Sequence, residues 1–361
     1  TFAKTLNSYD ATARTVSMTA GGTRTITFGG LVGAESQLST TNVTASAVVI
    51  DAAIAMGNHA LTINADNLAI NANISGTSTL TIQPKTASTA MIIAGDGTGG
   101  GLNLSTTELN YIQNGFTMIN LGSATGTGAI TLNTYAFSDN VTVRNPGAGS
   151  SGINFAGAVS VNNVGTNNLT LNTVGTVTQA SGAKITATGL ELLGAGATYT
   201  LTEPTNAVGT LAANTGVVSF VQDSANFTVG TVNTIGITTT GNLSLSGTNG
   251  MTITKDIVSG AGTQTYTGPI TLSTQAISLS STNKAISFEG STTTINGARA
   301  LTVDAGTSTI NFGGVVGGTT PITSLSATGS AGIVLTANIT TAGTQTYTGP
   351  VTLTNAIALN S

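Results

Sequence analysis

An eight-residue repeat is the feature that most constrains the fold of this chain. The octapeptide Gly-Thr-Gln-Thr-Tyr-Thr-Gly-Pro occurs at Gly262–Pro269 and again at Gly343–Pro350, a separation of 81 residues. A second matching pair of segments lies at Thr25–Gly33 and Thr309–Gly317. A β-sandwich or barrel has no reason to repeat a strand-and-turn unit at such distances, whereas a solenoid does. The repeats therefore predict a solenoid, in which function is spread along a surface.

Apolar–polar–apolar triplets recur along the chain and indicate strands with one buried face. Gly or Asn stands beside most of them, and these residues tolerate the left-handed backbone of tight turns. Helical periodicity is scarce, and only Thr106–Ile112 can form a short helical turn. The triplets include Val16–Met18, Leu61–Ile63, Leu102–Leu104, Ile130–Leu132, Leu169–Leu171, Leu243–Leu245 and Ile277–Leu279.

These patterns predict an all-β fold, a right-handed parallel β-helix with no globular second domain, because parallel crossovers are almost always right-handed. At roughly 20 residues per coil, the 81-residue repeat corresponds to about four coils and the chain to about 17 or 18. We expect residues 1–361 to form a single continuous shaft, with repeat units near 261–280 and 342–361. Both ends read as the middle of a repeat, so we expect a segment of a longer secreted protein.

The amino-acid composition limits the classes of function that this chain can have. Charged residues make up only 6% of the chain, against roughly 25% in ordinary domains. Disorder does not follow, because apolar residues make up 39% and are regularly spaced. The net charge of −4 offers no basic surface, so we expect no binding to nucleic acid. No stretch approaches 18 uninterrupted apolar residues, so we expect no membrane-spanning helix.

Catalytic chemistry finds little support in the residue types. His59 is the only histidine and there is no cysteine, so neither a Ser–His–Asp triad nor a structural zinc site is expected. Next to Gly57 and Asn58, His59 reads as a turn residue. Glycoside hydrolysis needs two facing carboxylates. Coil stacking could bring together Glu191 with Glu203, or Glu289 with Asp304, but solvated strand or turn positions explain these acids better.

Two further motifs have structural explanations. Gly95–Gly100 matches the spelling of a dinucleotide fingerprint, but a strand at Leu102–Leu104 follows where a helix would be needed. Asp96 within this motif could belong to a calcium-binding repeat, but such repeats must recur along the chain and this motif does not. Thr-x-Thr pairs such as Thr265/Thr267 and Thr346/Thr348 could belong to an ice-binding array, but outward strand residues explain them better. We therefore predict no catalytic, cofactor-binding or metal-binding residue.

Several longer segments go beyond generic β-helix character. They are Gly126–Leu132, Phe137–Arg144, Pro146–Gly147, Gly175–Ala183, Ala187–Ala195, Asn206–Asn214, Phe227–Gly230, Gly241–Leu245 and the octapeptide. With these segments, the chain between roughly Thr25 and Ser361 resembles the repeat regions of filamentous-haemagglutinin-like large exoproteins, which are bacterial adhesins of the two-partner secretion type. The resemblance implies a right-handed β-helical shaft on, or released from, the surface of a Gram-negative bacterium. It also implies export through an outer-membrane barrel transporter.

The leading hypothesis is a non-enzymatic extracellular shaft that presents repetitive Thr, Ser and Asn surfaces for attachment to an unidentified host, neighbouring-cell or matrix ligand. One alternative is a structural subunit of a filament or sheath that self-associates by end-to-end or lateral stacking. A second alternative, from a different class, is a polysaccharide-active β-helix enzyme.

Overall fold

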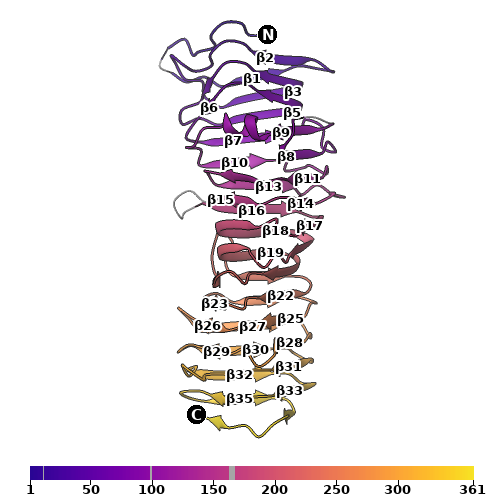
Figure 1. Ribbon diagram of the computed structural model, residues 1–361, viewed down its shortest axis with the longest axis vertical. Helices are drawn as coiled ribbons and strands as arrows, with labels where there is room; N and C mark the ends of the chain where they lie inside the picture. The colour runs from indigo at the N-terminus through magenta and orange to yellow at the C-terminus, as the bar shows by residue number, and fades with distance from the viewer. Residues whose placement is uncertain (11, 98–99, 162–166) are drawn as a thin grey trace. The chain divides into compact units, whose positions relative to one another are not determined.

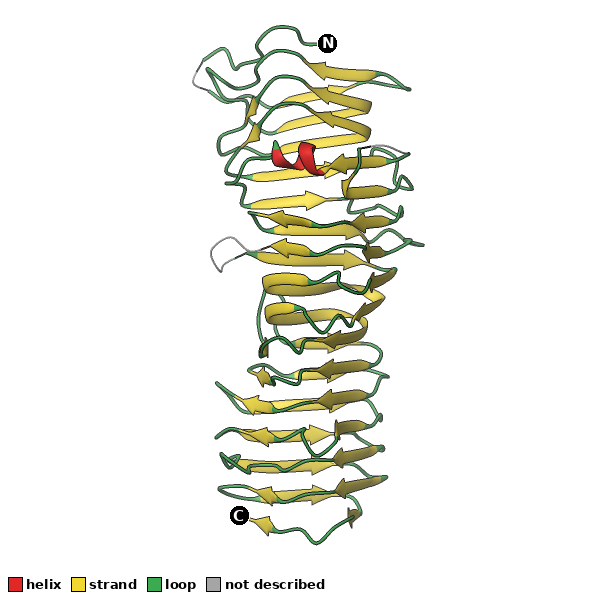
Figure 2. Cartoon of the chain, in the orientation of Figure 1, coloured by secondary structure: helices red, strands yellow, loops and turns green. Residues whose placement is uncertain are grey.

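The computed structural model describes residues 1–10, 12–97, 100–161 and 167–361. It is nearly all β, with parallel coils stacked into a β-solenoid (Figures 1 and 2). The predicted fold class is confirmed, and right-handedness stays a prediction. The coils number about 15 at a spacing of about 22 residues. The expected count of 17 or 18 was too high because the turns are longer than the assumed 20-residue coil allows. The chain divides into two compact units, residues 1–188 and 189–361.

Unit 1 contains β1 to β17, the start of β18 and one helix. The elements are β1 (Val16–Thr19), β2 (Thr25–Phe28), β3 (Thr41–Ile50), β4 (Ile54–Ala55), β5 (Leu61–Ile70), β6 (Ile74–Ser75), β7 (Thr79–Gln83), β8 (Met91–Gly95), β9 (Leu102–Ser105), α1 (Thr106–Asn110), β10 (Met118–Leu121), β11 (Ile130–Leu132), β12 (Tyr135–Phe137), β13 (Val141–Asn145), β14 (Ile153–Phe155), β15 (Val159–Val161), β16 (Asn168–Thr173), β17 (Thr176–Gln179) and β18 (Ile185–Leu201).

The parallel register in unit 1 is continuous along one face. The N-terminal half of β3 pairs with β1 and β5, and β5 continues through β7, β10, β13 and β16. The C-terminal half of β3 pairs with β2 and with the second half of β5. A single strand thus turns from one face of the solenoid to the next, as expected when inward positions stay apolar through the bend.

The helix α1 is the one helical interruption among the described residues, and its position was correctly predicted. Ser105 is the N-cap, and its Oγ accepts a hydrogen bond from the Glu108 backbone N–H at 3.2 Å. The Glu108 carboxylate accepts from the Ser105 backbone N–H at 2.8 Å, which completes a capping box. A helix this short depends on its cap and on the burial of Leu109, because one turn is not stable alone.

Unit 2 contains the rest of β18 and β19 to β37. The strands are β19 (Ala207–Val221), β20 (Phe227–Val229), β21 (Ile237–Thr239), β22 (Leu243–Ser246), β23 (Met251–Ile253), β24 (Ile257–Ser259), β25 (Gln264–Thr267), β26 (Ile270–Leu272), β27 (Ile277–Ser281), β28 (Ile286–Glu289), β29 (Ile295–Asn296), β30 (Ala300–Asp304), β31 (Thr309–Phe312), β32 (Ser324–Thr328), β33 (Gly332–Leu335), β34 (Ile339–Thr340), β35 (Gln345–Thr348), β36 (Val351–Leu353) and β37 (Leu359–Asn360).

Each coil of unit 2 has three strand faces. The long strand β19 pairs in turn with β20, β21 and β22. Face 1 continues from β20 through β23, β26 and β29. Face 2 continues from β21 through β24, β27, β30, β32 and β35. Face 3 continues from β22 through β25, β28, β31, β33 and β36.

Inward residues of unit 2 stack coil upon coil into a continuous apolar core. Tyr266, Phe288 and Phe312 form an aromatic column on face 3, with ring centroids 5.2 Å apart at both steps and nearly parallel planes. All three are almost completely buried. Outward positions on the same strands carry Thr, Ser and Asn, so alternation along each strand separates core from surface.

The two octapeptide copies lie on different faces, which corrects the expected repeat length. The residue that stacks on Gln264 four coils later is Val351, reached through Ile286, Ile310 and Ile333. The Gln of the second octapeptide, Gln345, comes before that position in the chain and lies on face 2. The 81-residue spacing is therefore shorter than four coils. The repeat has shifted by one face because coils here are longer than 20 residues.

Both copies nevertheless build the same inward hydrogen-bond network. In the first, the Tyr266 hydroxyl donates to Gln264 Oε1 at 2.7 Å, and Gln264 Nε2 donates to Ser259 Oγ at 3.2 Å and to the Ser280 carbonyl at 2.6 Å. In the second, Tyr347 donates to Gln345 Oε1 at 2.9 Å. Gln345 Nε2 then donates to Thr341 Oγ1 at 3.3 Å and to the Asn360 carbonyl at 2.6 Å. The repeated octapeptide therefore specifies one arrangement of side chains that line the core.

The more distant repeat encodes a corner. Gly33 and Gly317 have φ of +68° and +72°. A Cβ on either glycine would lie 2.2 Å or less from a backbone carbonyl oxygen of the next coil, that of Ala55 or of Thr340. Only glycine fits a left-handed position this close to a neighbouring backbone. The preceding Phe28 and Phe312 are both buried, so each copy joins an inward aromatic residue to a tight corner.

The aromatic column predicts a large local contribution to stability. Phe288→Ala should lower the free energy of unfolding by about 3–5 kcal/mol, because it removes a fully buried ring that is stacked on both sides. Val258→Ala, at a position that is 42% exposed, is the matched control and should cost under about 1 kcal/mol. Urea denaturation followed by far-UV circular dichroism measures both. Equal destabilisation by the two variants would contradict the role assigned to the column.

Candidate functional site

Corner Asn and Asp side chains in both units join successive coils. In each case a side-chain oxygen accepts a hydrogen bond from a backbone N–H one coil further along the chain, and the donor–acceptor distances are 2.8 to 3.0 Å. Most of these bonds are exposed, and they give N–H groups of the turns a partner on the neighbouring coil. The pairs are Asp66 with Thr86, Asn140 with Asn168, Asp223 with Thr248, Asn242 with Thr263, Asp256 with Ser278, Asn283 with Thr307, Asn296 with Thr319 and Asn338 with Ala358.

Glu191 and Glu203 serve two different loops of unit 2. The Glu191 carboxylate is only 2% exposed and accepts from Asn233 Nδ2 at 2.9 Å and from the Thr234 backbone N–H and Oγ1, both at 2.7 Å. Glu203 accepts from the Thr205 hydroxyl at 2.8 Å. The sequence predicted solvated strand or turn positions for both acids. This was wrong for Glu191, which is buried because the loop at Asn233 and Thr234 closes over it.

Glu289 and Asp304 lie on different faces. Glu289 ends β28 on face 3 and accepts from the Ser287 hydroxyl. Asp304 ends β30 on face 2 and accepts from the Gly306 backbone N–H at 2.9 Å. The two carboxylates therefore form separate local hydrogen bonds on separate faces.

The remaining motif residues have local structural roles. His59 lies in a turn, where its backbone N–H donates to the Met56 carbonyl at 3.1 Å. Within Gly95–Gly100, residues 98 and 99 fall outside the described part of the chain. Gly95 ends β8, and Asp96 Oδ1 accepts from Asn103 Nδ2 at 3.2 Å. The predicted strand that follows is β9. No helix therefore starts where a pyrophosphate would need one.

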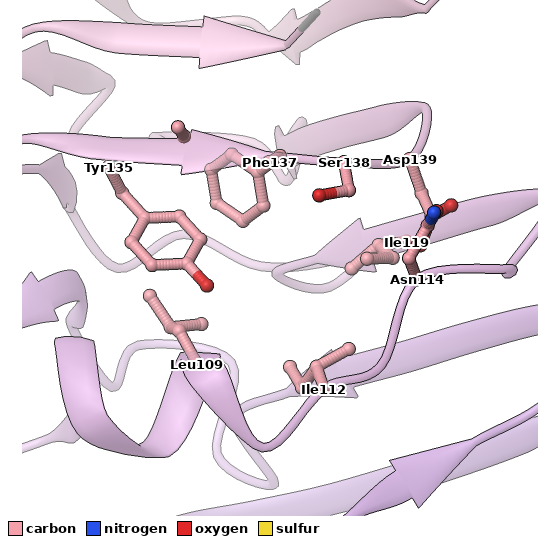
Figure 3. Close-up of a pocket in the computed structure, with 9 residues that line it drawn as sticks. Leu109, Ile112, Asn114, Ile119, Tyr135, Phe137, Ser138 and Asp139 are labelled. Atoms are coloured by element: carbon pink, nitrogen blue, oxygen red, sulfur yellow. The ribbon is translucent and has the colours of Figure 1, made fainter. Parts of the chain in front are cut away.

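The best-formed recess adjoins α1 in unit 1. Figure 3 shows Tyr135 and Phe137 of β12 above Leu109 of α1, with Asp139 at the far side. Its volume is about 30 Å³, enough for a water molecule or two but not for a sugar ring. The Tyr135 hydroxyl donates to Asn110 Oδ1 at 3.2 Å. The Asp139 carboxylate accepts from the Gly115 backbone N–H at 3.0 Å.

Burial perturbs both titratable groups of this recess. Desolvation raises the pKa of the Asp139 carboxyl, against the opposing effect of hydrogen bonds from the Gly115 and Phe116 backbone. Desolvation also raises the pKa of the Tyr135 hydroxyl. Perturbed acids in a recess are candidate catalytic groups. Here the volume admits only water, so the arrangement fits a structural role for Asp139 in fixing the loop at Gly115.

An open groove of about 440 Å³ lies on the outer side of β12, β15 and the start of β18. Tyr135 contributes to both this groove and the recess. Thr134, Ser160, Lys184 and Thr186 are among the other residues that line it. The groove is open and combines an aromatic residue, a lysine and short hydroxyl-bearing residues.

Face 2 of unit 2 presents two ranks of short polar side chains. Ser278, Thr302, Ser326 and Thr346 lie in register as one rank, and Ser280, Asp304, Thr328 and Thr348 form the second. Neighbouring members of a rank are about 4.8 Å apart, the spacing of paired strands. Thr265 and Thr267 belong to face 3, so the two Thr-x-Thr pairs of the octapeptides do not share one array. We name the first four residues the face 2 rank.

Searches against family models, curated proteins and solved structures each found no match to this chain. In the residues that the structure describes, no helix is long and apolar enough to cross a membrane. Among the same residues, no group of three or more His, Cys, Asp or Glu side chains is placed to hold a metal ion. The parallel strand pairing alone establishes the class of protein, a parallel β-solenoid.

The sequence alone did not single out Tyr135, Asp139 or Lys184. Asp139 lies between Ser138 and Asn140, directly before the strand pattern of β13. Nothing in the sequence distinguishes it from the other acidic residues at corners. Its burial depends on the loop after α1, which packs over it. A helical interruption at Thr106–Ile112 was the only available signal that this coil differs from the rest.

The coil-to-coil bonds predict a clear mutational signature. Asn296 Oδ1 accepts from the backbone N–H groups of Thr319 and Thr320, at 2.9 and 3.3 Å. Asn296→Ala should therefore lower the free energy of unfolding by about 0.5–1.5 kcal/mol, the net contribution of such a bond, because water can replace the lost acceptor at these exposed N–H groups. Asn296→Asp keeps the acceptor and should retain most of the stability. Urea denaturation tests both variants, and a loss from Asn296→Asp equal to that from Asn296→Ala would exclude the proposed cause.

Asp139 predicts a specific pH dependence of stability. Its pKa is raised above the ordinary value of 3.8, so the folded protein keeps this proton to higher pH than the unfolded chain. The stabilising contribution is therefore full below about pH 3.8 and is lost as the pH rises through the folded pKa. Relative to Asp139→Asn, the wild type should lose stability over this window. Urea unfolding of both proteins at stepped pH measures the difference, and parallel stability curves would refute it.

Proposed function

We propose that this chain is a non-enzymatic β-solenoid shaft of a large, secreted bacterial adhesin at a Gram-negative cell surface. The observation that carries the proposal is the use of the polar side chains. Corner Asn and Asp residues bond successive coils to one another, and the acids considered as catalytic pairs bond to separate loops or lie on separate faces. A chain whose reactive groups serve stacking suits a scaffold better than a catalyst.

The resemblance to filamentous-haemagglutinin-like exoproteins supports the same proposal. Those proteins use β-helical repeats as shafts, and the matched segments in this chain fall on strands and corners of the solenoid. Export through a barrel transporter belongs to the proposal for the same reason. The low content of charge helps here, because like charges repeated on successive coils would repel at about 4.8 Å.

The attachment mechanism would be avidity. Individual Ser, Thr and Asn side chains on an exposed strand face make weak contacts, but a regular rank makes many at once, and their effects combine. The face 2 rank supplies such a surface in unit 2, and the groove beside Tyr135 and Lys184 supplies a concave one in unit 1.

Loss of the face 2 rank should weaken attachment. The triple variant Thr302→Ala, Ser326→Ala and Thr346→Ala should reduce binding of the labelled chain to cell surfaces by on the order of tenfold, because three contacts leave one multivalent site. The matched control carries Thr228→Ala, Thr252→Ala and Thr271→Ala, which lie in register on face 1. Flow cytometry on epithelial and bacterial cells measures both.

Two results would overturn the proposal. One is binding of the wild-type chain no stronger than that of an unrelated β-solenoid of similar length. The other is cleavage of any member of a polysaccharide panel by the purified chain, provided that the cleavage is abolished by an Asp or Glu substitution. Equal loss in the two triple variants would reassign the contact away from face 2.

A further inference from the structure

Asn145, at the end of β13 in unit 1, has an amide held in one orientation. The side chain is only 2% exposed. Its Nδ2 donates to the Gly128 carbonyl at 2.7 Å and to the Gly152 carbonyl at 2.9 Å. The opposite amide orientation would place Oδ1 against these two acceptor oxygens, so the hydrogen bonds themselves fix the assignment of nitrogen and oxygen.

The same orientation leaves Asn145 Oδ1 buried without a donor in the described part of the protein. A buried acceptor without a hydrogen bond carries its full desolvation penalty. Ser123, Gly126 and Gly128 of the neighbouring corner line a recess together with Asn145. There the backbone N–H groups of Gly126 and Gly128 already donate to the Ser123 and Ala87 carbonyls. The protein thus has no N–H to spare from these two glycines.

A recess of about 10 Å³ lies at this position, lined by Asn145, Arg144, Thr89, Ser123, Gly126 and Gly128 among others. That volume accommodates about one water molecule and nothing larger. Arg144 borders it as a second polar group. Its Nε donates to the Gly122 carbonyl at 3.3 Å, and burial lowers the pKa of its guanidinium.

We propose that this recess is a binding site for a single ordered water molecule, which donates to Asn145 Oδ1. The water thereby links the end of β13 to the glycine-rich corner that lines the recess. A cation is disfavoured beside Arg144. A larger polar ligand is excluded by the volume.

High-resolution crystal structures of three proteins test the proposal. The wild type should show a water about 2.8 Å from Asn145 Oδ1. Gly126→Ala should displace that water while leaving Asn145 in place, because the new Cβ would lie 3.2 Å from the Ser123 carbonyl oxygen and 3.6 Å from Asn145 Cβ. Gly21→Ala is the matched control in the same unit, with nothing within 4 Å of its added Cβ, and should keep the water.

Water ¹⁷O magnetic relaxation dispersion gives an independent readout in solution. The number of long-lived internal waters should fall by one in Gly126→Ala and stay unchanged in Gly21→Ala. An empty recess in the wild-type crystal structure would overturn the proposal, as would an ion there or a protein donor bonded to Asn145 Oδ1. The wild-type structure decides the question even if Gly126→Ala fails to fold.

Discussion

The structure depends on the hydrogen bonding of each coil to the next. Parallel strands satisfy the backbone along the faces, but corners interrupt the ladder and leave N–H groups without a backbone partner. Asn and Asp at the corners meet that requirement from the neighbouring coil, as Asn296 does for Thr319 and Thr320. Glycines such as Gly317, with φ of +72°, allow the backbones to approach where no side chain fits. The abundance of Asn, Thr and Gly in the sequence follows from these demands.

Much of the fold could be predicted because period-two alternation and long-range repeats are direct consequences of stacking. The triplets Leu61–Ile63 and Leu243–Leu245 fall within β5 and β22, and the turn at Thr106–Ile112 contains α1. The face of the second octapeptide could not be predicted. A repeat length counts residues, whereas the face depends on every intervening turn, and those turns vary in length between coils.

The candidate site was less predictable than the fold, for a related reason. The sequence around Tyr135 and Asp139 has the same strand-and-corner pattern as other coils. Their pKa values are raised by burial. Glu191 likewise is buried because Asn233 and Thr234, far along the chain, close over it. Sequence patterns report which positions face inward. They do not report which irregular loop covers a given corner.

The octapeptide is repeated for its role in the core, and its two copies do not form one common surface. Its Gln and Tyr side chains point inward on two different faces and form the same hydrogen-bond network in each. The repeat therefore conserves one arrangement of core side chains within this chain. Its outward Thr residues consequently occupy unrelated surfaces, Thr265 on face 3 and Thr346 on face 2. The two copies therefore cannot act as one binding array, and the surface that each presents depends on its neighbours, as Thr302 and Ser326 lie in register with Thr346 on face 2. The neighbours of a copy are accordingly more informative about a ligand than the octapeptide itself.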